Sequence, residues 1–218
     1  MPGPPWGEDS SADEILVAAH VVTLLRELVG RAPERLGPTV GMAHTWHRAI
    51  YRGVGSVPLE SYLGAPRGST PELDGYEVGL LDHRGRLTAQ AVPAADVRSA
   101  LSGFQRSVTA AVAVLDDVIP VGARPRGGDE LMAVLRLAAE VHGEWVRIHP
   151  YANGNGRVAR VWANWLALRY GLPPFVRIKP RPDGLYYAQA AHRSMRLGDH
   201  ALTAQVFLDL LRAAPGTR

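Results

Sequence analysis

The segment from Ile148 to Arg160, which reads IHPYANGNGRVAR, combines residue types that suit a phosphate site. Gly154 and Gly156 lack a Cβ, so the backbone there can adopt positive φ angles and bring its amide groups close to a ligand. The helix expected to follow adds unpaired amides and the positive end of its dipole, and both favour an anion. The segment therefore predicts a loop and a helix N-terminus that bind phosphate.

Three further side chains of this segment carry charge or accept a proton. Arg157 and Arg160 are three residues apart, so on a helix they share one face, and guanidinium groups suit phosphate oxygens. His149 lies at the entrance and supplies an ionisable base with an ordinary pKa of about 6.5. These residues predict a site that binds a phosphate-containing molecule beside a general base.

The same segment resembles the signature of the Fic family, H-x-F-x-(D/E)-G-N-G-R-x-x-R. Tyr151 stands for the usual Phe, and Asn153 departs from the pattern because the family usually has an acidic residue there. The resemblance implies an all-α, Fic-like helical domain with a small β-hairpin flap. The remaining signature positions are matched by His149, Gly154, Asn155, Gly156, Arg157 and Arg160.

The resemblance also implies an activity, the transfer of a nucleoside monophosphate, usually AMP from ATP, to a hydroxyl group of a target protein. It assigns His149 as the general base and Arg157 and Arg160 to the terminal phosphates. The loop from Gly154 to Gly156 would hold the α- and β-phosphates, while Asn155 braces that loop and bonds a phosphate oxygen. Two alternatives stay open: transfer of UMP, GMP, phosphocholine or phosphoryl from another donor, and a non-catalytic nucleotide-binding regulator.

Asn153 bears on the expected cofactor, Mg²⁺. The acidic residue usual at this position helps to hold Mg²⁺, a cation that prefers carboxylate oxygens together with substrate phosphates. Asn153 offers an uncharged amide oxygen instead. Either the phosphates hold the metal and Asn153 assists as its candidate protein ligand, or the donor is not ATP.

The composition of the 218 residues excludes several classes of protein. The absence of cysteine rules out disulfides, a thiolate nucleophile and zinc-cysteine sites. The net charge of +3 comes from scattered arginines rather than a basic block, so a nucleic-acid partner is not expected. We expect a cytoplasmic protein without a membrane anchor, because the first residues lack a signal peptide's features and no apolar run approaches the roughly 20 residues of a membrane span.

Helical periodicity extends over most of the chain and predicts a single domain of seven or eight helices over residues 12–218. Residues 1–11 are rich in Pro, Gly, Ser and acidic residues and are expected to form a disordered tail. The predicted helices that have two clear ends cover residues 13–29, 42–52, 94–119, 129–147, 184–197 and 199–213, and another runs from the signature to about residue 170.

The first helix shows two patterns that a structure can test. Ser11 and Glu14 have the spacing of a capping box. An apolar stripe that includes Ile15, Val22 and Val29 is expected to face the core.

Residues 76–92 predict a β-hairpin, because Tyr76, Val78 and Leu80 alternate with other residues before a turn and a second apolar run. The resemblance implies that this hairpin is a flap on which the target protein docks. An exposed strand edge offers unpaired N–H and C=O groups to an incoming peptide. The alternative is a hairpin that only covers the core.

Two pairs of side chains have weaker assignments. His44 and His47 form an HxxH pair without further ligands at a recognised spacing, so a surface or core role is expected rather than a metal site. Tyr186 and Tyr187 follow a Pro-Asp-Gly turn, and the resemblance places them in the wall around the nucleotide base, with plain packing as the alternative.

Many Fic-like proteins are inhibited by a glutamate from an (S/T)xxxE(G/N) helix, which would pair with Arg160 here. Thr23 to Glu27 and Ser56 to Glu60 match this pattern in part, but a different residue follows each glutamate. We therefore expect that the chain does not inhibit itself and that any inhibition comes from a separate inhibitor protein.

Overall fold

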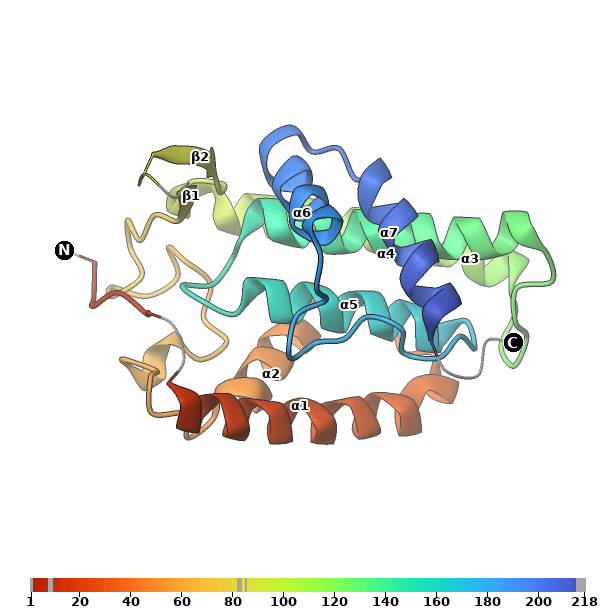
Figure 1. The fold of residues 1–218 in the computed structure, drawn as a ribbon, viewed down its shortest axis with the longest axis horizontal. Helices are drawn as coiled ribbons and strands as arrows, with labels where there is room; N and C mark the ends of the chain where they lie inside the picture. The colour runs from red at the N-terminus through yellow and green to blue at the C-terminus, as the bar shows by residue number, and fades with distance from the viewer. Residues whose placement is uncertain (1, 8–9, 82–83, 85, 215–218) are drawn as a thin grey trace.

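The computed structural model describes residues 2–7, 10–81, 84 and 86–214, and over these ranges the chain is all-α with one small hairpin (Figure 1). This confirms the predicted fold class, and no helix in the ranges described is long and apolar enough to cross a bilayer. The helices are α1 Ser11–Arg31, α2 Val40–Tyr51, α3 Val97–Val118, α4 Gly128–Ile148, α5 Asn155–Arg169, α6 Leu185–Leu197 and α7 Ala201–Ala213, and the strands are β1 Gly79–Leu81 and β2 Leu87–Gln90.

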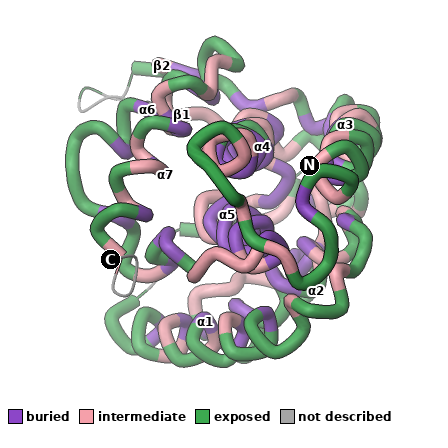
Figure 2. Tube along the Cα trace, turned by 90° about the vertical axis from the view of Figure 1, so that its right-hand side faces the viewer, coloured by how far each residue is buried: buried purple, intermediate pink, exposed green. Residues whose placement is uncertain are grey.

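Helix α5 occupies the centre of the molecule (Figures 1 and 2). It packs most extensively on α4, while α1 and α2 contact it from another side and α6 and α7 pack on α4. Residues on every side of α5 are buried, so the helix has no face that resembles a surface. Trp162 and Trp165 lie in the core, as predicted from their spacing on an apolar helix.

The start of α1 differs from the prediction by one residue. Ser10 is the N-cap: its hydroxyl accepts the Asp13 amide at 3.2 Å, and the Asp13 carboxylate accepts the Ser10 amide and hydroxyl in return. Asp13 also accepts the amides of Gly55 and Ser56, at 2.8 and 3.1 Å. The predicted cap at Ser11 is therefore wrong, because a tertiary contact with the loop after α2 selects the neighbouring pair.

The face of α1 that meets the core also differs from the prediction. Ile15, Val22 and Val29 are exposed. Because α1 carries apolar residues on more than one side, periodicity alone does not choose between them, and packing against α2 and α5 makes the choice. The buried apolar residues are Val17, Val21, Leu24 and Leu28.

Residues 2–7 pack on the body of the protein, so for this stretch the expected disordered tail is wrong. The Gly3 amide donates to the Glu72 carbonyl at 2.7 Å. The Trp6 indole is only 6% exposed and meets the Tyr51 ring edge-on, with 4.8 Å between the ring centroids. One large aromatic side chain thus anchors a stretch whose average composition indicates no core.

The hairpin between residues 76 and 92 is present. Strands β1 and β2 are antiparallel, with Leu80 opposite Ala89 and a register shift after Leu80. The Ala91 amide donates to the Val78 carbonyl at 3.1 Å and extends the pairing toward the body. Most of the predicted turn, residues 82–85, lies outside the described residues. In Figure 1 the hairpin lies at the same end of the molecule as the α4–α5 turn.

Replacing Trp6 tests the anchored N-terminal segment. We expect Trp6→Ala to lower the free energy of unfolding by about 3 kcal/mol, because it removes a buried aromatic ring. Ile15→Ala, at a side chain that is 75% exposed, is the control and should change stability by less than about 0.5 kcal/mol. Denaturant unfolding measures both, and equal effects of the two substitutions would contradict the packing of Trp6.

Candidate active site

His149 sits at the point where α4 ends. Its backbone is left-handed, with φ 52° and ψ 58°, and its amide donates to the Trp145 carbonyl at 2.9 Å. Pro150 disfavours the helical conformation for the residue before it, so the helix cannot continue through His149. His149 is therefore held at a turn, and it lines two adjoining cavities.

The hydrogen bonding of His149 determines which ring nitrogen can accept a proton. Nδ1 lies 3.0 Å from the Val146 carbonyl, which only accepts, so Nδ1 carries the proton and Nε2 keeps its lone pair. Burial, with a smaller effect of the Arg67 guanidinium, lowers the pKa of His149 to about 4, while the bond to Val146 acts in the opposite direction. The imidazole is consequently neutral near pH 7, as a general base must be.

Arg67, which the sequence analysis did not identify, stabilises this turn through hydrogen bonds to its backbone carbonyls. The side chain is buried, and its pKa is lowered by burial, with Glu77 opposing. No local motif marks it, because its partners come from distant parts of the chain. Its guanidinium donates to the carbonyls of His149 at 2.8 Å, Ile148 at 3.0 Å, Val92 at 2.6 Å and Tyr76 at 3.1 Å, and its amide donates to Pro150 at 2.6 Å.

The loop between α4 and α5 is braced by Asn155. Its Oδ1 accepts the Tyr151 amide at 2.9 Å and its Nδ2 donates to the Tyr151 carbonyl at 2.8 Å, which confirms the predicted bracing role. Gly154 has φ 81°, and a Cβ there would lie 2.5 Å from a ring carbon of Tyr51, so glycine is required. Asn155 and Gly156 are the first residues of α5 and line the cavity. Their amides precede the first hydrogen bonds within the helix, so they have no acceptor in it.

The HxxH pair on α2 supports this loop. His44 Nδ1 is 2.8 Å from the Tyr151 hydroxyl, and His47 Nε2 is 3.1 Å from the Asn153 carbonyl. The Gly64 amide donates to His47 Nδ1 at 2.9 Å, which completes the hydrogen bonding of that buried ring. Within the described residues no three His, Asp or Glu side chains converge as metal ligands would. His47 is fully buried, as expected for a core histidine.

One of the two cavities, of about 490 Å³, contains every residue predicted to bind phosphate. Sequence reasoning missed Glu14, Lys179 and Arg181, which line it as well. Arg157, Arg160, Lys179 and Arg181 give the cavity four cations against one acid, so it suits a ligand with several negative charges. The predicted residues that line it are His149, Asn153, Gly154, Asn155, Gly156, Arg157 and Arg160.

The two signature arginines are held in different ways. Arg157 donates to the Tyr51 hydroxyl and lies over that ring, with its guanidinium carbon 5.4 Å from the ring centroid. Arg160 is buried, and its Nε and one terminal nitrogen both donate to the Ile178 carbonyl, at 3.1 and 2.9 Å. A Cβ on Gly156 would lie 3.3 Å from the other terminal nitrogen of Arg160, so glycine admits the guanidinium beside the start of α5.

Glu14 is the acidic residue that lines the cavity of about 490 Å³. Its carboxylate accepts Lys179 Nζ at 2.9 Å, and its pKa is lowered by Lys179 first and by Arg157 to a smaller extent. Glu27 and Glu60, the two residues considered in the sequence, are exposed and line neither cavity at His149. Ser10 and Glu14 are also four residues apart and match the (S/T)xxxE pattern. This pattern was the feature of the sequence that could have identified Glu14.

A second cavity of about 620 Å³ shares His149, Gly156 and Arg160 with the first. Leu80 and Thr88 of the hairpin line it, as does Tyr187 of α6. Tyr186 is 72% exposed and lines neither cavity, so the structure brings only one of the two predicted tyrosines to the site. Successive residues of a helix point in directions about 100° apart, which explains why the pair divides.

Asn153 is held by two hydrogen bonds. Its Oδ1 accepts the Gly154 amide at 2.5 Å, and its Nδ2 donates to the Gly7 carbonyl at 2.7 Å. A carboxylate has no hydrogen to donate to Gly7, so this contact needs the amide of Asn153. Asn153 therefore ties the signature loop to the packed N-terminal segment.

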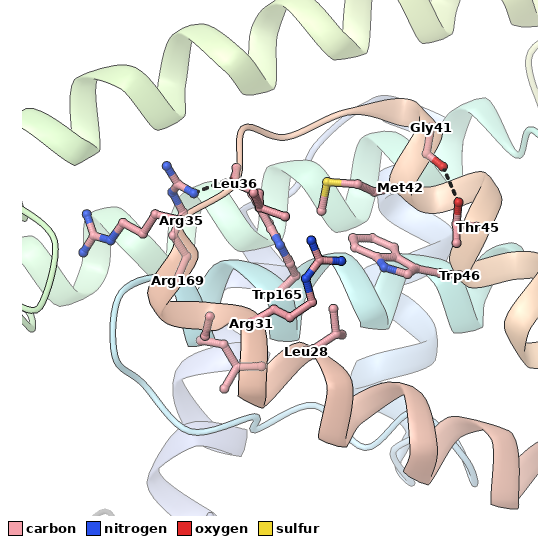
Figure 3. Close-up of a pocket in the computed structure, with 12 residues that line it drawn as sticks. Leu28, Arg31, Arg35, Leu36, Gly41, Met42, Thr45, Trp46, Trp165 and Arg169 are labelled. Carbon is pink, nitrogen blue, oxygen red and sulfur yellow. Dashed lines mark hydrogen bonds between the residues drawn. The ribbon is translucent and has the colours of Figure 1, made fainter.

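A further cavity, of about 200 Å³, lies between α1, α2 and α5 (Figure 3). Its lining is mainly apolar and includes Leu28, Met42, Trp46 and Trp165. It contains no residue of the signature, and Arg169 at its edge is engaged by Asp116 and the Leu36 carbonyl. This cavity is separate from the site at His149.

Comparison with known proteins decides the family. The sequence model of the Fic/DOC family matches residues 39–167, more than half of the chain, and this range contains the whole signature. The chain belongs to the Fic/DOC family. The match begins at the N-cap of α2 and ends in α5, so the family core is the part that carries His149 and both signature arginines.

Several relatives of this Fic/DOC chain have named activities. Protein adenylyltransferase Fic of Culex quinquefasciatus is 41% identical over 63 residues, which are 28% of this chain and 13% of that protein. The enzyme of the same name from Nematostella vectensis is 39% identical over 69 residues, 31% of this chain and 16% of that protein. A uridine 5′-monophosphate transferase of Xanthomonas campestris is 42% identical over 40 residues, 18% of this chain. The chain thus spans at most 16% of these three relatives' length.

Solved structures share the fold. A Fic domain containing signaling protein from Bacteroides thetaiotaomicron superposes with a TM-score of 0.63 and 17% identity, and the match covers 95% of this chain and 72% of that one. The BepC protein of Bartonella tribocorum, solved with bound AMPPNP, gives a TM-score of 0.55 and 13% identity and covers 89% of this chain and 85% of that one.

The low pKa of His149 predicts a dependence of stability on pH. Because the folded-state pKa of about 4 lies below the unfolded value of about 6.5, folding favours the neutral ring. Its contribution to stability is complete above about pH 6.5 and decreases as the pH falls toward 4. Thermal unfolding from pH 8 to pH 4.5 should show Tm falling below pH 6.5. His149→Gln should make this fall less steep without abolishing it, because burial lowers the pKa of His47 and of His142 to about 3 as well. An equally steep fall in the variant would contradict the shifted pKa.

Glu14 predicts an effect on anion affinity. Glu14→Gln removes the negative charge from the cavity lined by four cations, so the affinity for inorganic pyrophosphate should rise about two- to tenfold. Glu27→Gln, on the exposed side of the same helix, makes the same charge change away from the cavity and should have little effect. Calorimetric titration measures both dissociation constants, and equal changes in the two variants would show that Glu14 does not face the ligand.

Proposed function

We propose that this chain transfers AMP from ATP to a hydroxyl group of a target protein. One observation carries the proposal: the unprotonated Nε2 of His149 belongs to a side chain that lines a cavity with four cations and the N-terminus of α5. A base next to a polyanion site fits attack by a hydroxyl on a nucleotide phosphate. The adenylyltransferase names of the relatives support AMP as the transferred group.

In the reaction we propose, the oxygen of the target hydroxyl attacks the α-phosphorus of the nucleotide. His149 Nε2 takes the hydroxyl proton as the new P–O bond forms. The bond from the α-phosphorus to the bridging oxygen breaks, and pyrophosphate leaves with the electron pair. The amides of Asn155 and Gly156 and the dipole of α5 stabilise the charge that develops on the α-phosphate.

The cations of the phosphate-binding cavity act on the leaving group. We assign Arg157 and Arg160 to the terminal phosphates, since both line the cavity beside the start of α5. Lys179 and Arg181 add charge from the connector before α6. Asn155 uses its side chain to brace the loop, and a bond from this residue to a phosphate oxygen stays a prediction.

Mg²⁺ is part of the proposal, with the phosphates as its principal ligands. The protein offers Asn153 Oδ1, which already accepts the Gly154 amide, and this neutral oxygen fits an auxiliary ligand rather than the centre of a metal site. When bound, the metal would neutralise charge on the phosphates and orient them.

We also propose that the target docks on the hairpin. Leu80 of β1 and Thr88 of β2 line the cavity that contains His149, so a peptide paired with the strand edge would lie near the base. A separate inhibitor protein remains part of the proposal, because Glu27 and Glu60 lie away from Arg160. Glu14 is the glutamate that lines the same cavity as Arg160.

A second donor deserves a direct comparison with ATP. The uridine 5′-monophosphate transferase among the relatives favours UTP as the alternative, with the same transfer and a different base. A nucleotide-binding regulator without activity is the remaining alternative. The position and hydrogen bonding of His149 favour an active transferase over it.

A mass measurement tests the function. We expect the wild-type protein, incubated with Mg²⁺ and ATP, to add the mass of AMP to itself or to lysate proteins, and His149→Ala to abolish this transfer. The variant should still bind ATP within about threefold of wild type, because the base acts on the hydroxyl rather than holding the phosphates. Parallel reactions with UTP and GTP identify another donor. Nucleotide binding without any mass change would support the regulator instead.

A further inference from the structure

We propose that Tyr187 is a positioning residue: its hydroxyl, backed by His142, orients the Arg160 guanidinium toward the terminal phosphates of the donor. This inference rests on the proposed function, in which Arg160 binds those phosphates. It gives Tyr187 a role other than the base wall that the sequence suggests. The contacts of three buried side chains carry it.

Arg160 needs a second fixed point. Its Nε and one terminal nitrogen donate to the same atom, the Ile178 carbonyl oxygen, at 3.1 and 2.9 Å. Two bonds to one acceptor hold one edge of the guanidinium plane but still allow the group to pivot about that oxygen. The other terminal nitrogen donates to the Tyr187 hydroxyl at 3.3 Å and restricts this pivot. Arg160 is thereby held with its plane beside the start of α5.

His142 completes the arrangement from α4. Its Nε2 lies 2.9 Å from the Tyr187 oxygen, and both side chains are buried. Because the Tyr187 oxygen accepts from Arg160, its own hydrogen can be donated to His142 Nε2, which then carries a lone pair. A protonated His142 could not accept this bond and would repel Arg160. Burial, followed by the Arg160 charge, lowers the pKa of His142 to about 3, so the ring is neutral.

The choice of histidine at position 142 is informative. With Nε2 as the acceptor, Nδ1 carries the proton, and it has no hydrogen-bond partner within the described part of the chain. A buried donor without a partner is unfavourable, whereas an apolar side chain would pack on Phe207, 5.3 Å away between ring centroids, without that penalty. The hydrogen bond that Nε2 accepts from the Tyr187 hydroxyl explains a histidine at this position, whereas packing alone does not.

The geometry of the site explains why the contact between the Tyr187 hydroxyl and Arg160 would affect binding of the terminal phosphates in particular. Tyr187 and Arg160 both line the larger cavity at His149, and Arg160 also lines the cavity with the other cations. A shift of the guanidinium would therefore weaken contacts to the terminal phosphates. A ligand that lacks those phosphates would not experience the change.

The test compares ligands with and without terminal phosphates. Tyr187→Phe keeps the ring and removes only the hydroxyl. We expect its dissociation constant for ATP to rise about 5- to 30-fold and that for AMP to change by less than about twofold. Tyr186→Phe, the exposed neighbour on the same helix, is the matched control and should leave both constants unchanged. An equal loss of ATP and AMP affinity, or no loss of either, would overturn the inference.

Variants of His142 and Arg160 separate positioning from folding. His142→Gln retains an acceptor for the Tyr187 hydroxyl and should keep most of the ATP affinity, whereas His142→Leu should lose it as Tyr187→Phe does. In an Arg160→Ala background, Tyr187→Phe should have no further effect on ATP binding. A full additional loss in the double variant would mean that Tyr187 acts independently of Arg160.

The proposed function and this inference fail in different ways. Wild-type protein that binds neither ATP nor inorganic pyrophosphate would overturn both. If wild type binds ATP and Arg160→Ala weakens it, but Tyr187→Phe binds like wild type, only the role of Tyr187 is overturned.

Discussion

The structure of the site depends on one buried cation. Burying a guanidinium costs several kcal/mol unless its donors are satisfied, and Arg67 satisfies them with main-chain carbonyls rather than by a close carboxylate pair. Glu77 approaches it only at 3.5 Å. Because these carbonyls belong to the end of α4 and to both ends of the hairpin segment, one side chain joins His149 and the hairpin into a single unit. The left-handed backbone of His149, which is uncommon for a residue other than glycine, is stabilised by this unit.

The site also separates two electrostatic tasks. Around His149, burial and the Arg67 charge favour the neutral imidazole that a base requires. In the adjoining cavity of about 490 Å³, four cations and the start of α5 favour a polyanion. The two environments meet at Gly156 and Arg160, which line both cavities. The His149 imidazole can stay neutral beside a cavity with four cations, because burial and the Arg67 charge lower its pKa.

The departure at Asn153 acquires a physical meaning in the folded chain. Its amide donates to Gly7, and Trp6 next to it packs against Tyr51, whose hydroxyl accepts from Arg157. The N-terminal segment thus contacts the signature loop through an amide hydrogen that an acidic residue lacks. The first turn of α1, which Ser10 and Asp13 cap, also carries Glu14, and its carboxylate accepts Lys179 Nζ at the cavity.

The sequence by itself determined the helical class, the hairpin and the residues of the glycine-rich loop between α4 and α5, because these follow from local periodicity, glycine positions and a continuous signature. Asn155 braces its own loop through the backbone of Tyr151, four residues earlier. A contact between residues so close in the chain can be predicted from the sequence. Only the tertiary structure decided which face of α1 is buried and that residues 2–7 pack. It also brought Arg67, Glu14 and Lys179 to the site. Each of these depends on partners far apart in the chain, and no local pattern encodes which of several apolar faces or charged side chains will meet them.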